Sequence, residues 1–185
     1  METTLNKIKS HAPSSDGWEK LLNSLNKTQA DDEPLSILHI IESNGIQDAI
    51  WALRAVDGWD REIRLFAVWC ARQVQHLMSD ERSLKALDVA ERYANGNATY
   101  QELNAAAADA DAAASDALAA ASDAYRAAAM ASWAAARAAW ACAADAAATV
   151  RAAGDAWTAD RADATDAAAR ATQKEKLIEI INNAL

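Results

Sequence analysis

Two tryptophans and one arginine stand at helical spacing in the alanine-rich second half of this 185-residue chain. Arg137 comes four residues after Trp133 and three before Trp140, so an α-helix would bring all three side chains to one face. A guanidinium over an indole ring contributes about 0.5–2 kcal/mol as a cation–π contact. Flat rings beside arginines offer stacking for a base and forked hydrogen bonds for a phosphate. The spacing therefore indicates a site for a flat, anionic, nucleotide-like ligand.

Most other bulky residues of this segment fall on the same side of an ideal helix, which turns by about 100° per residue. When residues are placed at this angle starting from Tyr100, the bulky side chains form one ridge, called here the Trp/Arg ridge. Most of the aspartates, Asp109 and Asp116 among them, lie on the opposite side of the helix. The residues predicted to bind the ligand are Tyr125, Arg126, Trp133, Arg137, Trp140, Arg151 and Trp157. An alternative stays open, in which the rings only fill a groove beside the N-terminal helices and Arg137 reaches out to solvent.

A second cluster, "DGWDREIR", concentrates charge and one indole at a predicted helix start. As a patch for a protein partner it would use Trp59, Asp60, Arg61 and Arg64, flanked by Asp57 and Glu62. Its structural alternative is a capped, salt-bridged helix junction. Both interpretations stay open from the sequence.

Signals for catalysis, metals and cofactors are weak. Three histidines and two cysteines show no metal-ligand spacing, and five glycines form no phosphate loop. No arrangement of Ser, His and Asp suggests a nucleophile with its base. We expect a non-enzymatic protein without metal or cofactor.

The composition changes near Asn97, where an ordinary sequence gives way to alanine. This divides the chain into an N-terminal helical region, 1–97, and an alanine-rich helical region, 98–185, with a single domain left open as an alternative. No run alternates with period two, so no strand is expected. The predicted class is all-α, a bundle of about five shorter helices followed by long alanine-rich helices.

Helix boundaries are predicted from capping residues. Capping boxes pair Asp16 with Glu19 and Thr99 with Glu102. Pro34 is expected in a first turn and Asp60 at an N-cap. The expected helix ends are Gly45, Gly58 and Asn95-Gly96.

One helix face is predicted to form the core. Its apolar residues repeat at intervals of three and four and include Phe66, Cys70, Val74 and Leu77. They are expected to pack against Leu84, Leu87 or the helices before Gly58. Cys70 and Cys142 both lie in apolar helical settings and are expected to be reduced and buried.

The charge pattern excludes several classes of protein. A net charge of −9 argues against general nucleic-acid binding, which needs a basic face. Asp and Arg interrupt the alanine runs every few residues, so no membrane span is expected. The first twenty residues lack the apolar core of a signal peptide, and a cytoplasmic location is expected.

Three stretches carry a family resemblance. "ADDEPLSILHIIESNG", "DGWDREIRLFAVWCARQVQHLM" and "ALDVAERYANGNAT" resemble a family of alanine-rich proteins encoded by tailed bacteriophages. More distantly, about residues 60 to 120 are similar to predicted immunity proteins of bacterial toxin systems. The resemblance implies a helical, non-catalytic protein that acts by binding in the cytoplasm of a bacterial host.

Two functions follow as expectations. The first is a phage-type counter-defence protein that sequesters a nucleotide-derived immune signal, or a similar anionic small molecule, on the Trp/Arg ridge. The alternative is an immunity-type inhibitor that covers a host defence protein or a toxin. Self-association is left open in both.

Overall fold

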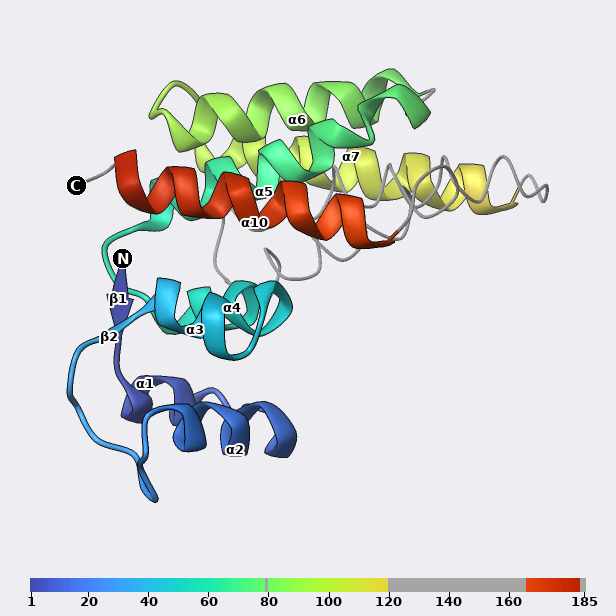
Figure 1. Ribbon diagram of the computed structural model, residues 1–185. Coiled ribbons are helices and arrows are strands. Elements are labelled where there is room, and N and C mark those ends of the chain that lie inside the picture. Colours follow the sequence, from blue (N-terminus) through green and yellow to red (C-terminus); the bar gives the residue numbers. More distant parts are fainter. Residues whose placement is uncertain (79, 120–165, 184–185) are drawn as a thin grey trace. The chain divides into compact units, whose positions relative to one another are not determined.

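Helices account for most of the described chain, as predicted for the all-α class. The computed structural model describes residues 1–78, 80–119 and 166–183 (Figure 1). These belong to two compact units, Met1–Trp59 with Lys174–Leu185 and Asp60–Gln173. The compositional boundary near Asn97 falls within the second unit, and as a statement about domains it stays a prediction.

Four short helices form most of the first unit. Its largest fully buried side chains include Leu5, Ile37, Ile40 and Leu53, which three of its elements contribute. The elements are β1 (Glu2–Thr3), α1 (Leu5–Ser10), α2 (Ser15–Ser24), β2 (Leu35–Ser36), α3 (Ile37–Ser43), α4 (Ile46–Ala52) and the 3-10 turn η1 (Leu53–Ala55).

A two-residue strand pair corrects the expectation of no strand. β1 pairs with β2 in antiparallel register, with Glu2 opposite Ser36 and Thr3 opposite Leu35. The Thr3 hydroxyl also donates a hydrogen bond to the carbonyl of Ala55. Two residues are too few to show alternation, so sequence periodicity could not reveal these strands.

Serine hydroxyls set two helix starts that were predicted wrongly. Ser14, not Asp16, caps α2, because the Ser14 hydroxyl accepts from the backbone N–H of Gly17 at 3.3 Å. Pro34 precedes β2 instead of lying in a first turn, and Ser36 caps α3 by accepting from the N–H of Leu38 at 3.2 Å. In both cases a nearby serine offered the backbone a competing cap.

Glycine at position 45 lets α4 follow α3 almost directly. Asn44 is the C-cap of α3, and Gly45 adopts a left-handed φ of 98° before α4 begins. This confirms the predicted helix end, since left-handed backbone favours glycine.

Three helices pack together in the second unit. α6 (Glu81–Ala94) packs against both α5 (Asp60–Gln73) and α7 (Tyr100–Ala119) and runs alongside α7 (Figure 1). α10 contributes residues to both units, and Leu177 and Ile181 on it are buried. The elements are α5 (Asp60–Gln73), the 3-10 turn η2 (Gln75–Leu77), α6 (Glu81–Ala94), α7 (Tyr100–Ala119) and α10 (Asp166–Asn183).

The predicted core face of α5 is confirmed in its main part. Phe66, Cys70 and Val74 are fully buried, and so is Leu87 on α6. Leu77 is half-buried, which corrects its assignment to this face. The reason is local, since α5 ends at Gln73 and Leu77 belongs to the 3-10 turn, where the helical phase of α5 no longer applies.

Alanines supply most of the buried face of α7. They follow Leu103 at intervals of three and four as Ala106, Ala107, Ala110, Ala113 and Ala114. Leu103 is fully buried, but Tyr100 is 53% exposed. At the start of α7, the buried stripe is therefore centred away from Tyr100. Asp109 and Asp116 are exposed as expected.

Candidate functional site

The seven residues predicted to bind an anionic ligand lie outside the described residues. They are Tyr125, Arg126, Trp133, Arg137, Trp140, Arg151 and Trp157. Cys142 lies outside them as well. The ligand site on the Trp/Arg ridge stays a prediction.

The "DGWDREIR" cluster makes contacts within the chain. Helix α5 begins at Asp60 itself, so Asp60 occupies its first turn rather than the N-cap, where a carboxylate still favours the helix dipole. Arg61 Nη2 donates to Asn95 Oδ1 at 2.7 Å. The Arg64 guanidinium lies 5.3 Å from the ring centroid of Tyr93. Both arginines therefore tie α5 to the end of α6, as expected of a helix junction.

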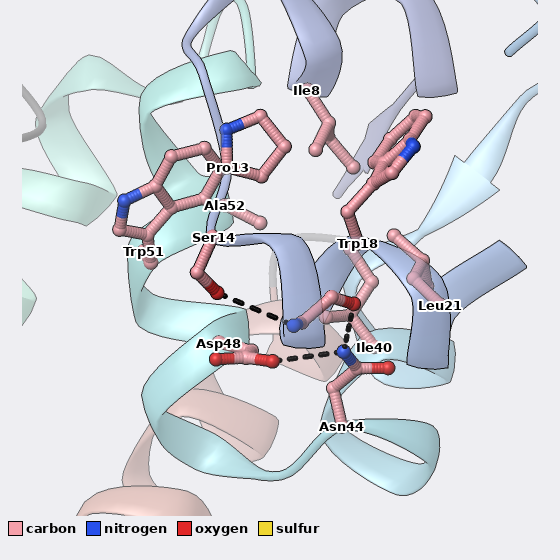
Figure 2. Close-up of a pocket in the computed structure, with 11 residues that line it drawn as sticks. Ile8, Pro13, Ser14, Trp18, Leu21, Ile40, Asn44, Asp48, Trp51 and Ala52 are labelled. Carbon is pink, nitrogen blue, oxygen red and sulfur yellow. Dashed lines mark hydrogen bonds between the residues drawn. The ribbon is translucent and has the colours of Figure 1, made fainter.

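A pocket that the sequence analysis missed lies within the first unit. It encloses about 440 Å³ including its mouth, and Figure 2 shows side chains from α1, α2, α3 and α4 around it. Its apolar wall is formed by Ile8, Pro13, Trp18, Leu21, Ile40, Trp51 and Ala52. Polar groups enter it from Ser14, Gly17, Asn44 and Asp48. The pocket is thus mainly apolar, with a few polar groups on one side.

Asn44 holds the polar side of the pocket together. Its Nδ2 donates to the carbonyl of Gly17 and to Asp48 Oδ2, both at 2.8 Å, and its Oδ1 accepts from the Ser43 hydroxyl at 2.9 Å. Both acceptors of Nδ2 lack a proton to donate, which assigns the orientation of the amide. One side chain therefore links α2, the end of α3 and α4.

Gly17 allows the Asp48 carboxylate to approach α2. A Cβ atom at this position would lie 2.8 Å from Asp48 Oδ2 and 3.0 Å from Ser14 Oγ. Contacts this short require a shift of the carboxylate. The absence of a side chain at Gly17 is thus part of how Asp48 is positioned.

The two indoles of the pocket are half-buried and come from different helices. Trp18 lies in the first half of α2 and Trp51 at the end of α4. The Arg54 guanidinium carbon lies 4.4 Å from the Trp51 ring centroid, and Arg54 Nε donates to the Trp51 carbonyl at 2.9 Å. The Arg54 guanidinium therefore covers part of the Trp51 ring. Arg54 is not among the residues that line the pocket.

A serine and a histidine of the same unit are in contact, and neither lines the pocket. Ser24 Oγ lies 3.0 Å from His39 Nε2 and donates to the carbonyl of Leu21 at 2.8 Å. A hydroxyl has one proton, so the imidazole is the donor in this contact whenever Ser24 donates to Leu21. Burial raises the pKa of the Cys70 thiol far above its ordinary range, which keeps it protonated and unreactive.

The described residues contain no metal site and no membrane-spanning helix. No group of three or more His, Cys, Asp and Glu side chains there could hold a metal ion. None of the described helices combines the length and the apolar character that a membrane crossing needs. Comparison with known proteins finds no matching family model, no matching curated protein and no matching solved structure.

Proposed function

We propose that this protein is a non-enzymatic binding protein that sequesters a small ligand with a flat ring in the pocket of the first unit. The observation that carries the proposal is the pair of half-buried indoles, Trp18 and Trp51, around an open and mainly apolar pocket. Small-molecule sites are typically of this kind, concave and mainly apolar with a few placed polar groups. The ring of a ligand would pack between apolar walls, and the Asn44–Asp48 pair would orient it.

A binding role without catalysis is supported by the chemistry of the pocket. Its lining residues include no histidine or cysteine, and the Ser14 hydroxyl oxygen is used to cap α2. The resemblance to phage proteins and to immunity proteins supports a counter-defence setting in the cytoplasm of an infected bacterium. The ligand would then be a small molecule that the host uses in defence.

The proposal is tested by analysing what the protein carries. Full-length protein is purified from phage-infected cells and denatured, and the released small molecules are identified by mass spectrometry. Wild type is expected to release a compound that Trp18→Ala and Trp51→Ala do not. Trp69→Phe changes an indole of the second unit and should release as much as wild type.

Circular dichroism first establishes that each variant is folded. Equal release from folded wild type and folded pocket variants would remove the pocket as the site. An empty protein that instead captures a host polypeptide would favour the immunity-type inhibitor, for which the predicted contacts are Trp59, Asp60, Arg61 and Arg64.

A second candidate site for the same role is the Trp/Arg ridge, favoured by the spacing of Trp133, Arg137 and Trp140. It would take an anionic ligand such as a nucleotide. Arg137→Ala should abolish release of an anionic compound and leave the melting temperature nearly unchanged, because an arginine reaching into solvent contributes little to stability. Unfolding of Trp140→Ala, or full activity of Arg137→Ala, would make the ridge structural.

A further inference from the structure

We propose that the pocket of the first unit selects an organic cation, an ammonium or guanidinium group on a short aromatic or apolar body. This inference rests on the proposed function and names the chemical class of its ligand. It concerns a different site from the Trp/Arg ridge, whose arginines favour the opposite charge.

Asp48 gives the pocket its charge. It is the one ionisable side chain among the described residues that line the pocket, and it is half-buried. Its Oδ2 accepts from Asn44 at 2.8 Å, and Figure 2 shows its other oxygen turned away from Asn44. A carboxylate in a mainly apolar pocket attracts a cation more strongly than it would in water. A ligand ammonium or guanidinium can donate to this second oxygen.

The indoles add a second attraction for a cation. Indole faces attract ammonium and guanidinium groups, and tryptophan is the most effective aromatic residue in this respect. The chain itself gives a precedent, because the Arg54 guanidinium stacks 4.4 Å from the Trp51 ring centroid. Trp18 presents an indole to the same pocket from α2. Together with Asp48, the rings supply aromatic surface and negative charge at one place.

Two cationic side chains nearby act against this preference but do not line the pocket. Arg54 is engaged with Trp51, and Lys20 Nζ is directed at the carbonyl of Asn44, 3.4 Å away. A purely structural role for Asp48 would be to place a negative charge in the first turn of α4. The link through Asn44 engages the Asp48 Oδ2 atom, and that role and this link leave its other oxygen for a ligand.

The test uses three probes with one phenyl ring and different charges. Full-length protein is titrated by calorimetry with 2-phenylethylammonium, 2-phenylethanol and phenylacetate. The cation is expected to bind at least about tenfold more tightly than the alcohol, as for a charge-assisted hydrogen bond, and the anion most weakly. Asp48→Asn should remove the tenfold preference for the cation over the alcohol.

Two matched variants distinguish the effect of where the Asp48 carboxylate lies from the effect of the protein's net charge. Gly17→Ala keeps the Asp48 charge but pushes against its Oδ2, so the cation preference should fall. Asp16→Asn removes an exposed carboxylate of α2 outside the pocket and should leave the preference unchanged.

Equal binding of cation and alcohol to wild type, or an undiminished preference in Asp48→Asn, would overturn the inference. So would a neutral or anionic compound whose release from infected-cell protein depends on Trp18. In that last case the sequestering function would stand and only the assigned charge of the ligand would fail.

Discussion

At the scale of single residues, Ser83 lies on α6, and its hydroxyl is completely buried. Ser83 Oγ has no hydrogen-bond partner among the residues that the structure describes. A buried polar group without a partner costs about 1–3 kcal/mol, because it has lost its hydrogen bonds to water. Alanine would remove the hydroxyl without opening a large cavity.

Ser83→Ala is therefore expected to raise the free energy of unfolding by about 1 kcal/mol, measured by urea denaturation. Ser115→Ala on α7 serves as control, because the exposed Ser115 hydroxyl donates to the carbonyl of Asp111 and should matter little. A loss of stability in Ser83→Ala would mean that its hydroxyl has a partner elsewhere in the chain.

Phe66 is a large side chain with no solvent exposure, and its ring stacks on Trp69 with centroids 6.3 Å apart. Phe66→Ala removes this contact and leaves a cavity, and it should lower the free energy of unfolding by about 3–5 kcal/mol. Leu65→Ala, at a half-buried neighbour, should cost less. A loss below about 1 kcal/mol for Phe66→Ala would contradict its place in the core.

At the scale of elements, the reciprocal cap at the start of α7 was predicted from sequence and is confirmed. The backbone N–H of Thr99 donates to Glu102 Oε2 at 2.8 Å, and the N–H of Glu102 donates to Thr99 Oγ1 at 3.2 Å. Arg92 adds a salt bridge to Glu102 at 2.9 Å. A helix rich in alanine has few side chains that mark its start, so this pair defines where α7 begins.

Thr99→Ala should lower the free energy of unfolding by about 1 kcal/mol, the usual effect of losing an N-cap side chain. Denaturation at neutral pH measures it. Asp109→Asn, at an exposed carboxylate further along α7, is the control and should have little effect. An unchanged stability in Thr99→Ala would show that packing alone determines where α7 starts.

The same cap makes the stability of α7 depend on pH. Hydrogen bonds from the backbone and hydroxyl of Thr99, then from Arg92, lower the pKa of Glu102. The ionised carboxylate is thus favoured by folding, and its contribution is fully present above the ordinary glutamate pKa. It is lost as pH falls through the lowered pKa of the folded state. Melting curves of Glu102→Gln should therefore show a weaker fall in stability over that acidic range than wild type.

At the scale of the whole molecule, most of the described residues are helical, and the strands among them are one pair of two residues each. Far-ultraviolet circular dichroism of the full-length protein is expected to give a strongly helical spectrum without a resolved sheet component. A substantial β contribution would contradict both the all-α architecture and the helical phase on which the Trp/Arg ridge depends.

The sequence by itself determined the helical class, the cap of α7, the turn at Gly45 and the buried face at Phe66, Cys70 and Val74. These features depend on residues within about four positions of one another, where helical periodicity and capping act. The caps of α2 and α3 are equally local, but Ser14 competes there with Asp16, and Ser36 with a start at Pro34, so the sequence did not single them out. The tertiary structure alone decided that Thr3 pairs with Leu35.

The tertiary structure alone also brought together the residues that line the pocket. Trp18 and Trp51 are far apart in the chain, and Asp48 reaches Gly17 only because α2 packs against α3, which in turn packs against α4. The folding of α2 onto α3 and α4 depends on the burial of apolar surface, which is non-directional and leaves no fixed spacing in the sequence. The candidate site therefore became visible only once these helices were packed together.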